Sequence, residues 1–207
     1  MSSAQPNPFE ADVDDIDIAR AREYALLATL LAQPPGAELI AGLARLRGDG
    51  SPLGMAHGTL AEAAERSSEE MAKREYFDLF GGLGQTSLLP YASHYLAGTL
   101  YGRPLMRLRE TLRTLGIERT AGRTEPEDHA AILCEIMAGL IRSDIAAPAG
   151  ADRTFFETHL APWIGRFFID LENAGSTPFY AGVGALGRSF IAIETGAFAL
   201  SAKAGET

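Results

Sequence analysis

Apolar residues at helical spacing near the C-terminal end of the chain constrain its fold more than any other feature. They stand at i, i+3, i+4, i+7, i+8 and i+11, as Leu160, Trp163, Ile164, Phe167, Phe168 and Leu171. This is the stripe of a helix with one buried face. No segment alternates apolar and polar residues in the manner of a half-buried strand. The pattern predicts a continuous helix over 160–171 within an all-α fold, and one core containing Trp163, Phe167, Leu171, Phe190 and Ile136.

The rest of the chain also has helical patterns. These patterns predict about seven or eight helices joined by short loops. One helix carries leucines at 105, 108, 112 and 115 and ends at Gly116, because glycine readily takes the left-handed conformation of a helix end. The first helix is expected from Ile16 to the stop at Pro34, with a face of Ile18, Arg22, Ala25, Leu26, Thr29 and Leu30. Leu27 and Leu31 widen this face, so the helix is expected to be buried on much of its circumference. The last is expected to begin at Thr177-Pro178, with a face of Phe179, Val183, Leu186, Phe190 and Ile193.

A capping box is suggested by Thr124-Glu125-Pro126-Glu127, in which a hydroxyl and a carboxylate satisfy backbone donors of the first helical turn. The sequence therefore predicts that a helix starts at Thr124, with His129 at the head of its apolar stripe. Carboxylates in a first turn are favourable against the helix dipole, so this acidic cluster is explained by capping alone. It also suits a ligand that is basic at one end and apolar along the rest. The residues by themselves leave both interpretations open.

Length and charge narrow the function classes. A chain of 207 residues is expected to form one domain, here 16–207, preceded by a mobile polar tail over 1–15. With 18 basic and 27 acidic residues the net charge is −9, which disfavours a nucleic-acid partner bound through phosphates. Cys134 is the only cysteine, so neither a disulfide nor a paired-cysteine zinc site is expected, and it reads as a buried apolar residue.

The N-terminal segment Met1 to Asp17 holds five acidic residues and no basic one, so it is not a signal peptide. No run approaches the roughly 20 apolar residues of a membrane span. The expected location is the cytoplasm. Four histidines lie outside any metal-binding motif, and Ser93-His94 diverge on a helix rather than forming a nucleophile and base. We expect no metal, no cofactor and no catalysis.

Several ordered motifs resemble the twin-arginine-system redox-enzyme maturation chaperones, the family of the trimethylamine-oxide and dimethyl-sulfoxide reductase chaperones. The resemblance covers about residues 18–200. It rests on Tyr76-Phe77-Asp78-Leu79-Phe80, Leu89-Pro90-Tyr91-Ala92-Ser93-His94-Tyr95-Leu96, Leu100-Tyr101-Gly102, Glu125-Pro126-x-Asp128-His129 with Met137, His159-Leu160-x-Pro162-Trp163 and Pro178-Phe179-Tyr180. The chain departs from the family pattern at Leu83, Ala92 and Leu133, where proline, glutamate and an acidic residue are usual.

The resemblance implies a non-catalytic, cofactor-free, all-α chaperone in the cytoplasm. Its partner would be the precursor of a molybdenum-containing oxidoreductase, of the formate dehydrogenase or the dimethyl-sulfoxide and trimethylamine-oxide reductase type, bound through the twin-arginine signal peptide until cofactor insertion and export. Family members form domain-swapped dimers through a linker, which here would be a hinge at 118–124, so a homodimer is also implied.

The resemblance further implies a peptide-binding site. The peptide's guanidinium groups would lie near Glu125, Glu127 or Asp128, and its apolar region would enter a groove near Leu79, Tyr91 and Tyr95. Arginine makes planar, charge-assisted contacts with carboxylates, as such a site requires. The full set of implied peptide-binding residues is Leu79, Pro90, Tyr91, Ser93, Tyr95, Glu125, Pro126, Glu127, Asp128 and His129.

Two alternatives compete with this interpretation. A chaperone of the nitrate-reductase type would bind a client that is never exported. An enzyme or small-ligand binder would instead use Asp128 and His129 as an acid and base, since paired titratable groups in a cleft are typical of active sites. Titration with a twin-arginine peptide separates these classes directly.

Overall fold

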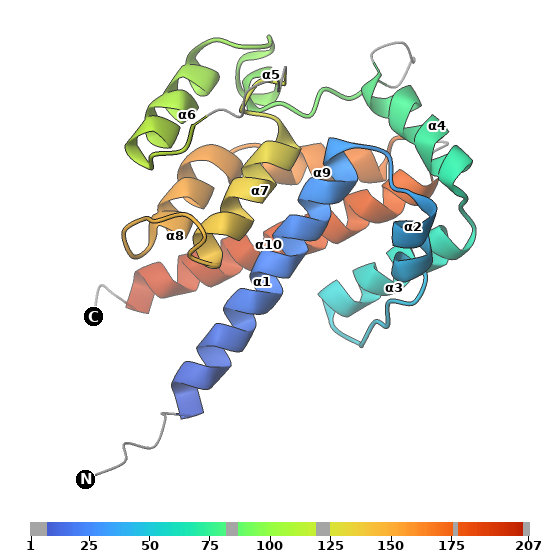
Figure 1. Cartoon of the computed structure of the whole chain (residues 1–207), viewed down its shortest axis with the longest axis horizontal. Helices are drawn as coiled ribbons and strands as arrows, with labels where there is room; N and C mark the ends of the chain where they lie inside the picture. The colour runs from blue at the N-terminus through green and yellow to red at the C-terminus, as the bar shows by residue number, and fades with distance from the viewer. Residues whose placement is uncertain (1–7, 82–86, 119–124, 176–177, 205–207) are drawn as a thin grey trace.

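The structure is a computed structural model that describes residues 8–81, 87–118, 125–175 and 178–204, with side chains described from 15 to 200 within those ranges. The all-α prediction is confirmed: the described ranges contain no named strand (Figure 1). The elements are α1 (Pro8–Ala32), α2 (Ala37–Leu43), α3 (Pro52–Glu65), α4 (Glu69–Phe80), α5 (Ala92–Ala97), α6 (Arg103–Thr114), α7 (Ala130–Ile141), α8 (Ala151–Phe155), the π-helical η1 (Phe156–Leu160), α9 (Ile164–Glu172) and α10 (Pro178–Ala204).

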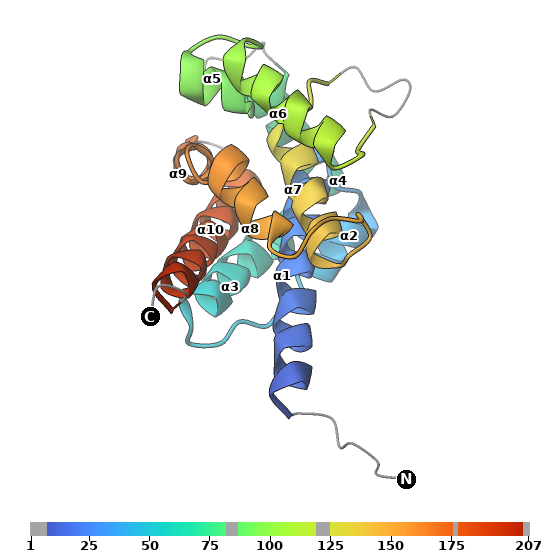
Figure 2. The ribbon, with the colours of Figure 1, turned by 90° about the vertical axis from the view of Figure 1, so that its left-hand side faces the viewer.

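Two long helices, α1 and α10, organise the bundle. The first packs along α7, and α10 packs against α9 and α3. In both views α5 and α6 lie at one end of the molecule, whereas the N-terminal part of α1 projects from the opposite end (Figures 1 and 2). The predicted core is confirmed, because all five of its residues are buried: Ile136, Trp163, Phe167, Leu171 and Phe190. Cys134 is fully buried too, and burial raises the pKa of its thiol to about 12.

The prediction of one continuous helix over 160–171 is wrong. The chain passes from α8 through the π-helical turn of η1, and α9 begins only at Ile164. Pro162 lies at this break, where its missing N–H and its ring are incompatible with an uninterrupted helix. Trp163 leaves the helical region with a φ of −147°, and its indole Nε1 donates to the carbonyl of His159 at 2.8 Å. All six apolar side chains of the predicted stripe are nevertheless buried.

The boundary and face of α1 differ from the sequence-based prediction. The helix begins at Pro8 rather than Ile16, and residues 1–7 of the predicted tail lie outside the described residues. Ile18 and Arg22 are exposed, whereas Ala21, Tyr24 and Leu27 are buried. The expected burial on several sides of the helix is confirmed, because Leu27, Leu30 and Leu31 are buried and the helix packs against both α7 and α10.

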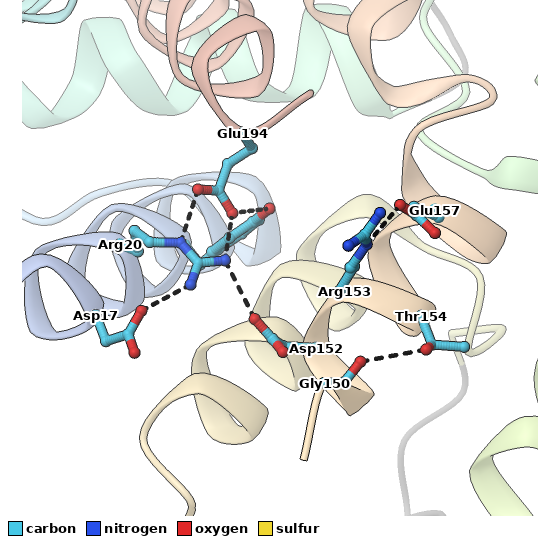
Figure 3. Close-up of polar contacts among 9 residues, drawn as sticks. Asp17, Arg20, Gly150, Asp152, Arg153, Thr154, Glu157 and Glu194 are labelled. Atoms are coloured by element: carbon cyan, nitrogen blue, oxygen red, sulfur yellow. Dashed lines mark hydrogen bonds and ion pairs between the residues drawn. The ribbon is translucent and has the colours of Figure 1, made fainter. Parts of the chain in front are cut away.

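A charged cluster fastens α1 to α10. The guanidinium of Arg20 donates Nε and Nη2 to the carboxylate of Glu194, at 2.8 and 2.9 Å, and Tyr24 donates its hydroxyl to the same carboxylate (Figure 3). Asp17 and Asp152 also accept from Arg20, and Asp152 thereby connects α8 to this contact. Glu194 is almost completely buried. The predicted burial of Ile193 is wrong, because α10 turns Glu194 inward to meet Arg20 and leaves Ile193 exposed.

The start of α10 is held by a residue from a distant segment. Glu75 of α4 accepts the backbone N–H groups of Phe179 and Tyr180, at 3.0 and 3.2 Å. The hydroxyl of Tyr180 in turn donates to the carbonyl of Leu30 at the end of α1. A carboxylate at a helix N-terminus satisfies donors that have no partner within the helix. These contacts join α1, α4 and α10.

The stretch Pro178–Leu200 of α10 is long and apolar enough to cross a membrane, with a mean hydropathy of 1.3 over 23 residues. The sequence-based expectation that no run approaches this limit is therefore wrong. The criterion is also met by core helices of globular proteins. In α10 the side chains of Phe179, Tyr180, Val183 and Leu186 are fully buried against the rest of the bundle.

Candidate functional site

Two segments singled out by their sequence meet at a single antiparallel bridge between Tyr91 and His129. The N–H of Ala92 donates to the carbonyl of Asp128 at 3.0 Å, and the N–H of Ala130 donates to the carbonyl of Pro90 at 2.8 Å. The Tyr91 and His129 rings meet edge to face with centroids 5.1 Å apart. The bridge places the beginning of α5 beside the beginning of α7.

Asp128 is completely buried beneath this bridge. Its Oδ2 accepts the backbone N–H of Ser93 at 2.8 Å, so a carboxylate from one segment caps the helix that begins in the other. Its Oδ1 has no hydrogen-bond partner within the described ranges. Ser93 is also buried, and its hydroxyl accepts the N–H of Tyr101. Asp128 and Ser93 therefore hold the α5–α6 connection in place and present no atom to solvent.

The predicted helix start at Thr124 is wrong. Thr124 lies outside the described residues, and α7 begins at Ala130 with His129 as its N-cap. The Nδ1 atom of His129 accepts the N–H of Ala131 at 3.1 Å. Because the backbone at His129 is extended and pairs with Tyr91, it cannot also continue a helix from Thr124. Burial lowers the pKa of His129, partly opposed by Glu125 and Asp128, which favours a neutral ring that can accept this bond.

The acidic residues before α7 differ in accessibility. Glu125 is exposed and accepts the hydroxyl of Tyr91. The pKa of Tyr91 is well above its ordinary range, first because of burial and then because of this bond. Glu127 is largely covered and accepts Nε and Nη2 of Arg109 on α6, at 3.0 and 2.8 Å. Glu125 is thus the member of the predicted set that presents a carboxylate at the surface.

Two cavities flank the outer face of α7. One, of about 650 Å³, lies between α1 and α7, and the other, of about 530 Å³, lies between α6 and α7. Glu125, Ile132 and Glu135 line both, so we describe the pair as one groove that crosses α7. Among the charged residues that line each cavity, glutamates outnumber arginines two to one. The groove combines an acidic rim with the apolar surfaces of Ala25 and Ile132.

The structure separates the predicted apolar residues from this groove. Leu79 is fully buried in the core, and Pro90 is buried next to the bridge. Tyr95 points elsewhere, with its hydroxyl on Asp170 at 2.9 Å and its ring against Trp163. Leu79, Tyr91 and Tyr95 therefore do not line a common groove.

Other residues line the groove that sequence reasoning missed. Tyr76 of α4 lines its α1–α7 half together with Ala25, Ala28 and Ala32, and Glu135 projects from α7 into both halves. The small residues at three- and four-residue intervals on α1 are a signal that could have pointed to this face, because they let another chain approach the helix closely. Their meeting with α7 depends on tertiary packing.

Asp128 and His129, the predicted acid and base, both make hydrogen bonds to backbone N–H groups. Asp128 uses one oxygen for Ser93, and His129 uses one ring nitrogen for Ala131. Within the described ranges no group of three or more histidine, cysteine, aspartate or glutamate side chains could hold a metal ion. The chemistry that this arrangement supports is binding of a cationic and partly apolar chain.

The motif order and the all-α bundle agree with the results of comparing the chain with known families. A family model described as "Nitrate reductase delta subunit" matches residues 47–169, more than half of the chain. The chain belongs to this family. Together with the relatives named as TorD and DmsD chaperones, this match confirms the resemblance to redox-enzyme maturation chaperones.

Curated relatives of this family member are named as chaperones. "Chaperone protein TorD" of Aliivibrio fischeri is 32% identical over 130 residues, covering 58% of this chain and 60% of the relative. "Tat proofreading chaperone DmsD" of Salmonella typhimurium is 31% identical over 128 residues, covering 60% and 61%. The match thus spans about three fifths of these relatives' lengths. A solved structure described as a redox enzyme maturation protein from Archaeoglobus fulgidus shares the fold, with a TM-score of 0.52 at 20% identity over 83% of this chain and 93% of that one.

Proposed function

We propose that this protein is a cytoplasmic chaperone that binds the twin-arginine signal peptide and precursor of a molybdenum-containing oxidoreductase. It holds the precursor until the cofactor is inserted and export can begin. The observation that carries the proposal is the groove over α7, in which Glu125 and Glu135 stand beside the apolar side chain of Ile132. A twin-arginine peptide has the complementary character, with two guanidinium groups followed by an apolar stretch.

In this proposal the guanidinium groups lie at the acidic rim near Glu125 and Glu135. A guanidinium donates paired hydrogen bonds to a carboxylate in one plane, and such charge-assisted bonds are stronger than bonds between neutral groups. The apolar stretch lies along Ile132 and the small residues of α1, Ala25 and Ala28. Burial of that stretch contributes roughly 25 cal/mol for each Å² of apolar surface removed from water. No covalent bond is made or broken.

The other predicted residues support this groove in different ways. His129 lines the α1–α7 half of the groove, and Tyr91 orients the carboxylate of Glu125 through a hydrogen bond. The buried hydrogen bond between Asp128 and Ser93 holds the bridge between Tyr91 and His129 in place. The carbonyl of Pro90 accepts the backbone N–H of the first residue of α7.

Pro126 shapes the turn before the bridge, since its carbonyl accepts the N–H of His129. Glu127 contributes negative potential while paired with Arg109. Leu79 belongs to the core. Tyr95, a residue of α5, attaches that helix to Asp170 and Trp163.

The proposed client is an exported enzyme of the formate dehydrogenase, dimethyl-sulfoxide reductase or trimethylamine-oxide reductase type. The word "proofreading" in the name of one relative favours a client with a twin-arginine peptide. A second candidate is an assembly chaperone for a nitrate reductase that is not exported, which the description of the matching family favours. The two functions differ in whether the basic pair of the peptide contributes to binding.

Calorimetric titration with twin-arginine peptides tests the proposal. Wild-type protein should bind the peptide of the enzyme encoded beside it, and replacement of both peptide arginines by lysine should weaken binding, because lysine cannot make the planar paired contact. Glu125→Gln and Glu135→Gln should each weaken binding by about 1–3 kcal/mol. Glu70→Gln, on the exposed face of α4, is the matched control and should bind like wild type.

Two outcomes would contradict the proposal. Equal affinity for the arginine and lysine peptides would show that paired guanidinium contacts do not contribute to binding. That result would favour the nitrate-reductase alternative. Unchanged affinity in both glutamate variants would move the site away from the α7 groove. Salt should weaken wild-type binding, since exposed charges are screened over about 8 Å at physiological ionic strength.

A further inference from the structure

The hairpin of α5 and α6 carries a charge opposite to that of the chain as a whole. Residues 91–116 contain four arginines and one acidic residue, Glu110, whereas the net charge of the protein is −9. Arg109 is paired with Glu127. No ion pair joins Arg103, Arg107 or Arg113 to any residue in the described ranges. These three arginines are exposed residues of α6. Together with α5, this helix forms one end of the molecule (Figure 2).

The same hairpin exposes large apolar side chains. Met106 is 68% exposed and stands between Arg103 and Arg107 on one face of α6. A cavity of about 400 Å³ beside this face is lined by Leu96, Arg103 and Arg107, among others. Leu96, at the end of α5, is 45% exposed. Apolar surface rimmed by charged groups is typical of protein interaction sites.

The connection between α5 and α6 has a strained backbone at Tyr101, whose aromatic ring is exposed. Tyr101 has a φ of 69°, in the left-handed region that bulky residues rarely occupy, and its side chain is 57% exposed. Its N–H is held by the buried hydroxyl of Ser93. The strained conformation is therefore imposed by a buried contact and keeps the Tyr101 ring at the surface. A basic peptide would be repelled by this hairpin, so an occupant must be acidic and partly apolar.

The chain itself contains a segment of that character. Residues 1–17 include five acidic residues and no lysine or arginine, together with Phe9, Val13 and Ile16. Ile16 is 60% exposed. The N-terminal part of α1 projects from the end of the molecule opposite to α5 and α6 in both views (Figures 1 and 2). Because Arg20 and Tyr24 fasten α1 to α10, the segment cannot reach the hairpin of its own chain.

We infer that the acidic N-terminal segment of one copy docks on the arginine-rimmed α5–α6 hairpin of a second copy. Two copies related by a twofold axis, with their long dimensions antiparallel, place each N-terminal segment beside the partner's hairpin. The two contacts are equivalent, so the assembly closes as a dimer. A segment with five acidic residues, of which Asp17 is already paired with Arg20, then faces a hairpin with three more arginines than acids. This surface is separate from the acidic groove over α7.

A charge-exchange experiment tests the inference. Sedimentation velocity at low salt should show a reversible wild-type dimer that weakens as salt is added. Arg103→Glu with Arg107→Glu, and separately Asp12→Lys with Asp14→Lys, should each weaken self-association at least about tenfold. The first pair gives the hairpin the same sign of charge as the segment, and the second leaves the segment with only one more acidic than basic residue. An equimolar mixture of the two double variants should form a heterodimer, because the unchanged acidic segment faces the unchanged hairpin and the introduced lysines face the introduced glutamates. Lys73→Glu with Arg74→Glu, on exposed α4 positions, should dimerise like wild type.

The mixture also controls for folding, since a misfolded variant could not restore a specific dimer. The inference is overturned if wild type is monomeric across the concentration range at low salt. It is equally overturned if both double variants keep the wild-type dimer, as a dimer swapped through 118–124 would, or if their mixture stays monomeric. Peptide titration is a separate readout, so failure of the dimer and failure of the proposed function can be told apart.

Discussion

The carboxylate of Asp128 accepts the backbone N–H of Ser93 at 2.8 Å, and through this buried bond the segment before α7 caps α5. The two residues are separated by 35 positions. Their contact joins the two motifs that most distinguish the sequence. It explains why aspartate stands at a position that no solvent reaches.

Removal of this cap should destabilise the hairpin. We predict that Asp128→Ala lowers the free energy of unfolding by about 1–3 kcal/mol, because the N–H of Ser93 is left buried without an acceptor. Asp128→Asn should lose less, since its amide oxygen can still accept the bond. Urea unfolding measures the change, and amide hydrogen exchange should show the loss at Ser93. Asp78→Ala, at an exposed position of α4, is the control, and an equal loss there would contradict the assignment.

The contact between His57 and Glu23 should make stability depend on pH. His57 Nε2 lies 2.8 Å from Glu23 Oε1, and this hydrogen bond, opposed in part by burial, raises the pKa of His57 above its ordinary value near 6.5. The folded protein therefore binds this proton more tightly than the unfolded chain does. The stabilisation is fully present below the unfolded pKa of about 6.5 and is lost as pH rises through the higher folded pKa.

His57→Gln isolates this effect. Burial lowers the pKa values of His129 and His159, so these residues contribute stability above about pH 6.5 that is lost as pH falls. Wild type and His57→Gln share the contributions of His129 and His159, so these contributions cancel in the difference between the two free energies of unfolding. That difference should favour wild type at pH 5.5 and shrink toward pH 8. A constant difference across this range would show that the proton on His57 does not stabilise the fold.

The bond between Arg20 and Glu194 should be among the costly polar contacts to remove. We predict that Glu194→Ala lowers the free energy of unfolding by about 2–4 kcal/mol, because it leaves a largely covered guanidinium without its main partner. Asp17 and Asp152 remain to limit the loss. Glu157→Ala breaks the nearby pair with Arg153, which is solvent-exposed, and should cost less than about 0.5 kcal/mol (Figure 3). Chemical denaturation of both variants would reveal equal losses if the burial of Glu194 were unimportant.

Trp163 should be essential to the core. Its side chain is 2% exposed and packs against Tyr95 and Phe167, with ring centroids 5.4 and 6.0 Å away. We predict that Trp163→Ala costs about 3–5 kcal/mol through lost transfer energy and the cavity that it leaves. Ile169→Ala, at a position 47% exposed, should cost far less. Thermal melts provide the measurement, and a melting temperature like that of wild type for Trp163→Ala would contradict the core assignment.

The sequence by itself determined the all-α class and most of the residues that enter the core. Apolar spacing is a local property, so the stripe over 160–171 identified six buried side chains even though Pro162 interrupts the helix that carries them. Leu105, Leu108 and Leu112 are likewise buried on α6, and Gly116 takes a φ of 67° at its end. The family motifs also marked Asp128 and His129, whose surroundings the spacing alone could not describe.

Tertiary structure decided which faces meet and which charges are covered. Thr124 has the pattern of a helix start, yet the bridge from Tyr91 to His129 delays α7 to Ala130. Glu194 is buried only because Arg20, 174 residues earlier, lies against it. The groove over α7 likewise exists only where α1 and α6 approach the same helix. Helical periodicity is encoded within one or two turns, whereas the partner of each face depends on how the whole chain buries its apolar surface and satisfies its buried polar groups.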